Sequence, residues 1–388
     1  MKQDFIKERW MKSISHIFEN IVDTENIINT MFRATKGKKN KYGVIRDLLR
    51  YDKIVDNAVL IKEGLEKSLF PLQGKRTPKL IHEPSANKDR IIYPPNMTEH
   101  VIHHLVCQEL EPIFKRSMYD FCVASVPGRG SSYGKKFMQK WIKSYNGKKV
   151  YVLKLDIHHF FDSIDRQLLF NKLSKKIKDE RFLEVVRKII WYDGDENTTG
   201  IPIGFYTSQW FANFFLQDFD YFVKQQLHIQ HYMRYMDDMI LLHTNKRELR
   251  RAYDQIVEYL HNMGLNLNNK HQLFRFSYIG KDGKERGRAI DFMGFVFHVN
   301  RTTIRKRTLF RARRKANRVA KKSKYSWYEA VQLISMVGRL KRTDTHQYFE
   351  KYILCKINLK RAKDIVSRHT RKESKRRMYL NGLQTINQ

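Results

Sequence analysis

The sequence predicts an α+β fold in which amphipathic helices pack around a small antiparallel sheet. Apolar residues recur at helical spacing through most of the chain. The segments concerned are approximately residues 1–34, 43–70, 98–116, 166–191, 208–227 and 247–263. Residues 149–155 instead alternate in the manner of a half-buried strand. Two further β-type runs, Tyr232–Tyr235 and Met239–Leu242, are close enough to form a tight hairpin, and Asp291–His298 is a further expected strand.

The composition indicates a folded protein that binds a polyanion. Hydrophobic residues make up 41% of the 388 residues, as in globular chains. Lysine and arginine number 75 against 40 acidic residues, which gives a formal charge of +35. Self-repulsion of this size strains a compact fold unless a partner such as RNA or DNA neutralises it. An anionic membrane surface is the competing partner, but the charge is spread along the chain and no lipidation signal stands out.

Cysteine spacing and apolar segments exclude several other classes. Cys107, Cys122 and Cys355 are too far apart for a disulfide framework or a local zinc knuckle. Residues 1–23 mix charges through their apolar positions, so they do not form a signal peptide. No later window reaches a membrane-spanning apolar length. We therefore expect a soluble, cytoplasmic protein with no membrane partner.

Three aspartates are the candidate chemical centre. Asp156 ends the strand at residues 149–155, and Asp237 and Asp238 lie at the tip of the predicted hairpin. Adjacent carboxylates raise each other's pKa and repel unless cations lie between them. Magnesium prefers oxygen ligands, and two ions about 3.5–4 Å apart can activate a hydroxyl and stabilise a departing oxygen. The alternative is an ordinary polar turn, because Asp is common in turns; the surrounding motifs decide against it.

Ordered motifs around these aspartates resemble those of reverse transcriptases, over about residues 30–345. The matching segments are Tyr235–Asp238 for the YxDD box, Lys154–Asp165 for motif A, Gly264–Lys270 for motif D and Phe292–Phe295 for the primer grip. The resemblance implies an RNA-directed DNA polymerase with a right-hand polymerase fold. It also implies two Mg²⁺ ions at Asp156, Ile157, Asp237 and Asp238, and the binding of template RNA, an RNA/DNA duplex and deoxynucleotides.

The resemblance assigns roles to further residues. Phe161 matches the steric gate that favours deoxynucleotides, although either Phe160 or Phe161 is expected to be core. Lys88 and Arg90 match the fingers motif that contacts the incoming triphosphate, and their alternative is a solvated basic loop. Lys270 resembles the motif D lysine proposed to protonate the leaving pyrophosphate.

Arg234 directly precedes the YxDD box and needs no role of its own. We expect it to be a surface charge of the palm.

Motif B narrows the family. Most bacterial reverse transcriptases of the intron and retron types carry Pro-Gln-Gly…Ser-Pro there. This chain has Ile203 at the glutamine position, followed by Gly204, and Gln209 at the proline position. That form resembles the bacterial and phage enzymes of diversity-generating retroelements. The resemblance places Ile203, Gly204 and Gln209 in the substrate site. It also implies error-prone copying at template adenines, a structured template RNA and an accessory protein.

Other functions stay open at this point. An antiphage-defence reverse transcriptase of the retron, abortive-infection or unclassified type would copy a dedicated noncoding RNA. A catalytically silent RNA-binding scaffold and an RNA-dependent RNA polymerase are alternatives from other classes. The intact aspartates argue against the scaffold, and Phe161 argues against the RNA polymerase.

The predicted lobes follow the change in composition near Asn300. Residues 1–148 would form an N-terminal helical region and the fingers. Residues 149–298 would form the palm, with part of the fingers at about 166–200. Residues 299–388 would form a basic helical thumb and tail, because no acidic residue occurs between Phe292 and Tyr328. The basic tail lacks the Cys/His pattern of an endonuclease and is too short for a full maturase domain, which disfavours an intron mobility protein.

Overall fold

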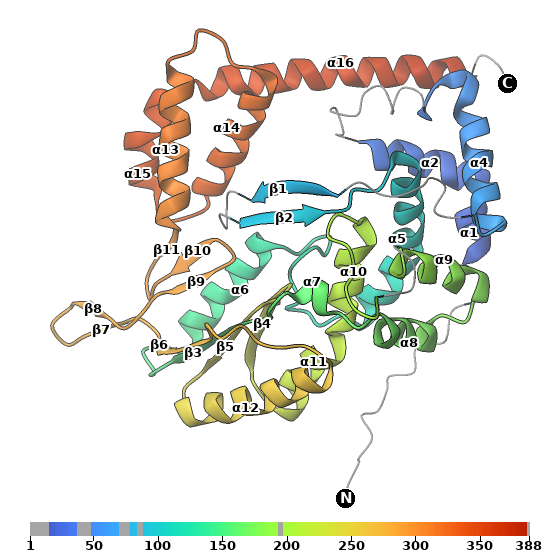
Figure 1. Ribbon diagram of the computed structural model, residues 1–388. Helices are drawn as coiled ribbons and strands as arrows, with labels where there is room; N and C mark the ends of the chain where they lie inside the picture. Colours follow the sequence, from blue (N-terminus) through green and yellow to red (C-terminus); the bar gives the residue numbers. More distant parts are fainter. Residues whose placement is uncertain (1–14, 37–47, 70–77, 84–87, 193–196, 386–388) are drawn as a thin grey trace, which may run out of the picture. The chain divides into compact units, whose positions relative to one another are not determined.

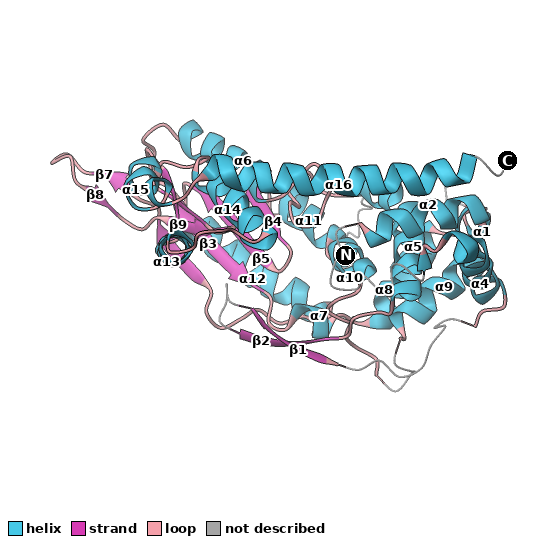
Figure 2. Cartoon of the chain, turned by 90° about the horizontal axis from the view of Figure 1, so that it is seen from above, coloured by secondary structure: helices cyan, strands magenta, loops and turns pink. Residues whose placement is uncertain are grey.

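The computed structural model describes residues 15–36, 48–69, 78–83, 88–192 and 197–385 (Figure 1). It confirms the predicted α+β class, because helices dominate and the strands are short and pair in small antiparallel sheets (Figure 2). Within the described part of the chain, no helix combines the length and apolar composition needed to cross a membrane.

The chain forms two compact units, each made of three segments. Unit 1 comprises Met1–Val126, Leu155–Met239 and Arg250–His271, and unit 2 comprises Pro127–Lys154, Ile240–Leu249 and Gln272–Gln388. Unit 1 combines parts of the expected fingers and palm ranges, and unit 2 combines parts of both with the whole expected thumb range. The boundaries of those lobes therefore stay predictions.

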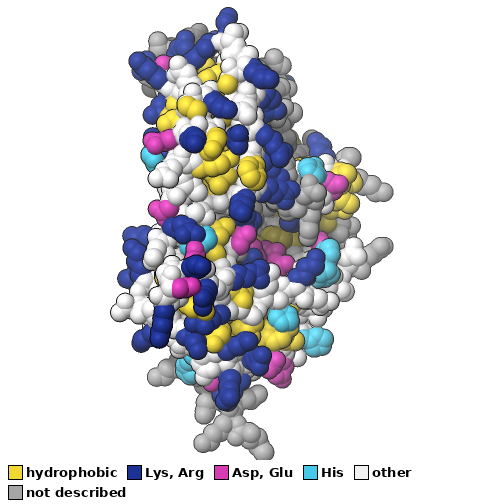
Figure 3. Space-filling view, turned by 90° about the vertical axis from the view of Figure 1, so that its left-hand side faces the viewer, with side chains coloured by type: hydrophobic (Ala, Val, Ile, Leu, Met, Phe, Trp, Pro, Cys, Tyr) yellow, Lys and Arg dark blue, Asp and Glu magenta, His cyan; other side chains and the backbone are white. Residues whose placement is uncertain are grey.

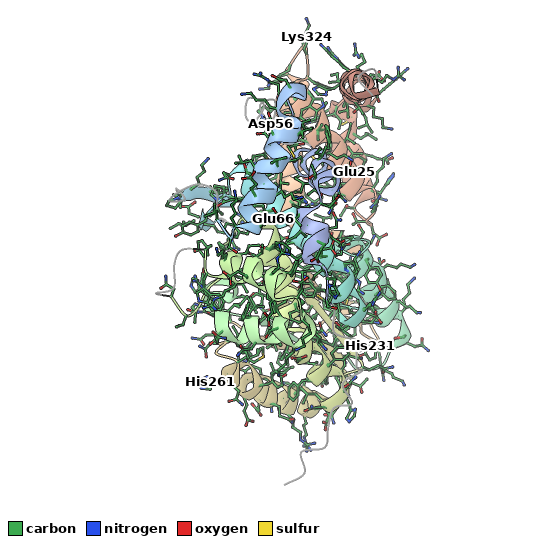
Figure 4. All side chains as sticks on the ribbon, turned by 90° about the vertical axis from the view of Figure 1, so that its right-hand side faces the viewer. Glu25, Asp56, Glu66, His231, His261 and Lys324 are labelled. Carbon is green, nitrogen blue, oxygen red and sulfur yellow. The ribbon has the colours of Figure 1, made fainter. Side chains whose placement is uncertain are left out.

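The N-terminal helices of unit 1 pack together, α1 and α2 against α5 and α4 against α1 and α2. They are α1 (Phe18–Val22), α2 (Thr24–Thr35) and α4 (Ile54–Glu66), the last preceded by a 3₁₀ turn at Tyr51–Lys53; α5 spans Met97–Ser117. A capping box at Asn96 and Glu99 starts α5 and satisfies backbone donors there. The exposed carboxylates Asp56 and Glu66 both come from α4 (Figure 4). Residues 1–14 and 43–47 of the predicted helices lie outside the described residues.

Two predicted long helices are each interrupted. The region 166–191 divides into α8 (Arg166–Lys176) and α9 (Glu180–Ile190), after the short α7 (Phe160–Ser163). Asp179 is the N-cap of α9, because its carboxylate accepts from the N–H of Phe182, and it also accepts hydrogen bonds from the backbone of Ile17 and Phe18. The region 208–227 divides into α10, α11 and a π-helical turn. Their bounds are Tyr206–Phe215, Gln217–Tyr221 and Phe222–Gln226.

The strands from the middle of the sequence form a four-stranded sheet, in the order β4-β5-β3-β6. Its strands are β3 (Tyr151–Asp156), β4 (His231–Tyr235), β5 (Asp238–His243) and β6 (Gln272–Arg275). The inner positions of β3 and β5 are buried, which explains their apolar runs. Helix α12 (Lys246–Asn262) follows β5 as predicted. A separate antiparallel hairpin joins β1 (Lys79–Glu83) to β2 (Lys88–Ile92).

The expected single strand at Asp291–His298 is wrong, because this segment folds as a hairpin. Strands β9 (Ile290–Phe292) and β10 (Phe295–Phe297) pair across Met293 and Gly294. Both loop residues have positive φ, 53° and 83°, as a type I′ turn requires. Strand β11 (Thr302–Ile304) completes a three-stranded sheet, and β7 (Tyr278–Ile279) pairs with β8 (Glu285–Arg286).

The rest of unit 2 is helical (Figure 1). Its helices are α6 (Ser131–Ser144), α13 (Lys306–Ala320), α14 (Trp327–Leu340), α15 (His346–Tyr352) and α16 (Leu359–Thr385), with a 3₁₀ turn at Leu354–Lys356. Helix α14 packs against both α13 and α16. A capping box at Ser326 and Glu329 starts α14.

Candidate active site

The hairpin of β4 and β5 presents the two adjacent aspartates. Its loop consists of only Met236 and Asp237, and Asp238 begins β5. Met236 has φ 60°, in the left-handed region that non-glycine residues seldom adopt. The surrounding structure must therefore hold this loop in place, as is common at functional sites.

The third aspartate ends the neighbouring strand. The backbone N–H of Ile157 donates to the backbone carbonyl of Asp237 at 3.4 Å, which joins the end of β3 to the hairpin loop. Burial and the negative charges of Asp156 and Asp238 raise the pKa of Asp237 to about 6, against the lowering effect of Arg90. Asp156 and Asp238 thus lie near enough to Asp237 to repel its charge.

The donor set suits a divalent cation chemically. Carboxylate oxygens are the ligands that Mg²⁺ prefers, and the repulsion at Asp237 is what a cation would relieve. Within the described ranges, no three His, Cys, Asp or Glu side chains stand close enough together to hold a metal ion as they are. Mg²⁺ is usually held by one or two carboxylates, with waters and substrate phosphates as its other ligands, so a pair of these aspartates would be sufficient.

Asn268 supports Asp156 from the predicted motif D. Its side-chain amide donates to the Asp156 carboxylate at 3.3 Å, and its backbone N–H donates to the Asp156 carbonyl at 2.7 Å. The adjacent N–H of His158 donates to the carbonyl of Asn266 at 2.8 Å. The sequence identifies motif D, but it does not indicate that Asn268 binds Asp156. Lys270, two residues on, is exposed.

The two basic residues of the predicted triphosphate site lie on β2. Arg90 is exposed, and its charge lowers the pKa of Asp237, so it belongs to the surroundings of the carboxylates. The backbone of Lys88 pairs with Glu83, whereas its side chain lies outside the described residues.

A backbone hydrogen bond joins the predicted gate residue Phe161 to the segment of motif B. Phe160 is buried at 3% exposure, whereas Phe161 is half-buried, which confirms that one of the two rings is core. The carbonyl of Phe161 accepts from the N–H of Ile201 at 2.9 Å, and the carbonyl of half-buried Ile203 accepts from the N–H of Tyr93 at 3.1 Å.

Gly204 and Gln209 complete the predicted motif B set. Gly204 is exposed with φ 118°, so a side chain there would be strained. A Cβ on Gly204 would lie 3.5 Å from the Tyr93 carbonyl oxygen. Gln209 is exposed on α10.

Arg234 is not the surface charge that we expected. Its side chain is fully buried and forms an ion pair with the equally buried Asp220, at 2.6 Å between Nη2 and Oδ2. Burial lowers the pKa of Arg234, but the charge and hydrogen bonds of Asp220, together with Cys122 and Tyr232, raise it by more in sum, so the guanidinium stays charged. The sequence gives no signal for this pairing, because Asp220 lies on a different element, α11.

Comparison with known families agrees with the geometry of the site. A family model described as "Reverse transcriptase (RNA-dependent DNA polymerase)" matches residues 81–297, which is more than half of the chain. The chain therefore belongs to the reverse transcriptase family. The family that the motifs predicted is confirmed.

Individual relatives are distant. Protein YkfC of Escherichia coli strain K12 is 21% identical over 192 residues, which is 47% of this chain and 49% of that protein. This chain thus spans about half the length of that curated relative. Among solved structures, apo telomerase from Candida tropicalis, truncated from its C-terminal domain, has a TM-score of 0.43 and 15% identity, over 58% of this chain and 53% of that one. Telomerase from Candida albicans in complex with a fragment of telomeric RNA has a TM-score of 0.43 and 14% identity, over 72% and 55%.

Proposed function

We propose that this protein is an RNA-directed DNA polymerase that copies a structured template RNA into cDNA. The observation that carries the proposal is the group of three carboxylates. Asp156 lies close enough to Asp237, at the tip of the hairpin, for its negative charge to raise the pKa of Asp237. Asp156, Asp237 and Asp238, with the backbone of Ile157, would hold two Mg²⁺ ions. When bound, these ions would supply Lewis-acid activation of the attacking hydroxyl and charge stabilisation of the leaving group.

Neighbouring side chains would select and orient the nucleotide. Arg90 and Lys88 would bind the triphosphate, since guanidinium and ammonium groups are good partners for phosphate. Phe161 would exclude the ribose 2′-hydroxyl. Lys270 would give a proton to the departing pyrophosphate; its exposure on the surface allows this role.

Helix α13 would bind the phosphates of the template–primer duplex. Arg307, Arg314 and Arg318 are exposed on this helix, and Phe310 among them is 49% exposed. Figure 3 shows many Lys and Arg side chains, with hydrophobic ones between them, over the region of α13 and α15. Basic side chains contact duplex backbones, whereas an aromatic ring among them suits sugar or base contact.

The decisive experiment measures incorporation of deoxynucleotides on a primed RNA. Wild-type protein should extend the primer only with Mg²⁺, and Asp238→Ala should lose about 10³-fold or more of the rate, because several kcal/mol of charge stabilisation disappear. Asp254→Ala, which removes an exposed carboxylate on α12, serves as the control. No incorporation by wild type would support a silent RNA-binding scaffold. Equal use of ribonucleotides would support an RNA polymerase.

We further propose that the enzyme belongs to a diversity-generating retroelement and works with an accessory protein or noncoding RNA. Ile203 and Gln209 support this subtype, because a residue without an amide at position 203 cannot hydrogen-bond across the templating pair. Misincorporation should concentrate opposite template adenines. Sequencing the RNA and cDNA bound to protein purified from its host provides the second test. A fixed product copied faithfully from a noncoding RNA would favour antiphage defence instead.

A further inference from the structure

We infer that Arg234 is the positioning residue of the carboxylate hairpin, which it fixes by binding the carbonyl of the loop residue Met236. The inference rests on the proposed function, because it concerns the same aspartates. It differs from that proposal in assigning the placement of the aspartates to a residue that binds neither nucleotide nor metal.

The contact with the loop is direct. Nη1 of Arg234 donates to the carbonyl oxygen of Met236 at 3.1 Å. Met236 is the loop residue with φ 60°, and its carbonyl belongs to the peptide that leads into Asp237. Fixing this carbonyl fixes the orientation of that peptide, and therefore the direction in which Asp237 and Asp238 leave the loop.

The guanidinium can hold the loop because the rest of it is anchored. Nε and Nη2 each donate to one oxygen of the Asp220 carboxylate, at 2.7 and 2.6 Å. Such a two-point pair fixes the plane of the guanidinium, which an ammonium group could not do. Arg234 and Asp220 are both fully buried, so water does not compete for these bonds.

The same arginine ties the hairpin to the helix that follows motif B. Its Nη1 also donates to the side-chain oxygen of Asn213 at 3.1 Å, and its Nη2 donates to the Asn213 carbonyl at 3.3 Å. Asn213 lies on α10, and its own amide donates to the carbonyl of Ala124 at 2.9 Å. The loop that carries Asp237 is therefore held against α10 and, through Asn213, linked to the backbone of Ala124.

A neighbouring tyrosine offers a matched control. The hydroxyl of Tyr232 donates to the same Asp220 carboxylate at 2.7 Å, and it too is fully buried. The hydrogen bonds of this hydroxyl do not include the Met236 carbonyl. Tyr232→Phe therefore weakens the buried network without removing the link to the loop.

The test compares Arg234→Lys with Tyr232→Phe in the full-length protein. Lysine keeps the charge beside Asp220, but it cannot bind both oxygens of Asp220 and the Met236 carbonyl at once. We expect Arg234→Lys to lower kcat about 100-fold, which is the effect of a displacement of about 1 Å at a reacting centre. The KM for primed RNA should change little. The Mg²⁺ concentration for half-maximal rate should rise about tenfold, because losing a residue that supports a metal ligand typically weakens metal binding by this factor.

A second readout does not depend on catalysis. Mn²⁺ binding to the protein without nucleotide, measured by electron paramagnetic resonance, should weaken in Arg234→Lys and stay within twofold of wild type in Tyr232→Phe. Both variants should show a lowered melting temperature. If wild type fails to extend primers, the proposed function fails, and the Mn²⁺ comparison still reports on the placement of the aspartates.

Equal kcat and equal Mn²⁺ affinity in the two variants would overturn the inference. If Arg234→Lys does not fold, the neutral pair Asp220→Asn with Arg234→Gln is measured in the same way. This pair leaves no uncompensated buried charge, so it should fold. Failure of both to fold would show that Arg234 serves stability alone.

Discussion

Two hairpins in this chain have two-residue loops that begin with methionine, but they stabilise that methionine differently. Met236 and Met293 have nearly the same φ, 60° and 53°. Met293 is followed by Gly294, which adopts positive φ at little cost. Met236 is followed by Asp237, and a buried arginine binds its carbonyl. Asp237, unlike Gly294, does not have positive φ, so the two loops are different turns, and the loop with the carboxylate is held by a long-range contact from Arg234.

The largest expected effect comes from giving the catalytic loop the sequence of the other one. Asp237→Gly creates Met-Gly in the hairpin of β4 and β5. The rate of nucleotide incorporation should fall about 10³-fold or more, because a metal ligand is lost. The free energy of unfolding in metal-free buffer at neutral pH should stay equal or rise, since burial and Asp156 disfavour the charged form of Asp237. A rate within tenfold of wild type would contradict this.

Replacing the glycine in the hairpin of β9 and β10 should destabilise that hairpin without a steric clash. Gly294→Ala places a Cβ where no atom lies within 4 Å, so its cost is conformational. The left-handed backbone should lower the free energy of unfolding by about 1–2 kcal/mol, as measured with urea. Gly338→Ala in α14 is the control, since that glycine also has open space but lacks positive φ; it should stabilise by about 0.5–1 kcal/mol. A loss at both positions would refute the conformational explanation.

The smallest effect concerns the first residue of each loop. Met293→Asn creates Asn-Gly, the preferred sequence for a type I′ turn, and should raise the free energy of unfolding by about 0.5–1 kcal/mol. Met236→Asn should lower it instead, because Met236 is only 9% exposed and its side chain would be replaced by a polar amide. Urea unfolding of both variants measures the contrast. A gain in both loops would show that burial of Met236 matters little.

Local patterns predicted the parts of the site that depend on neighbouring residues in the sequence. Alternation located β3 before Asp156, and β-type runs located the hairpin with Asp237 and Asp238. The family of the chain followed from the order of its motifs. These features depend on periodicity and turn length, which a sequence displays directly.

The rest of the site depends on contacts between distant segments. The residues around Arg234 in the sequence predict a surface charge. Arg234 is buried because it packs against α11 and α10, which the sequence of its own strand does not indicate. Asn268 reaches Asp156 from another segment in the same way. The hairpin at Met293 was missed for a different reason. Residues 291–298 are mostly apolar, and Gly294 alone is only weak evidence for a turn within them.

The hydrogen bond between Asn268 and Asp156 also has a consequence for protein synthesis. The two residues are 112 positions apart. At a translation rate of about 5–20 residues per second, the ribosome adds the second partner roughly 6–22 s after the first. Asp156 therefore leaves the exit tunnel long before its partner exists. A nascent chain stalled between these residues should be more accessible to proteases near Asp156 than the finished protein.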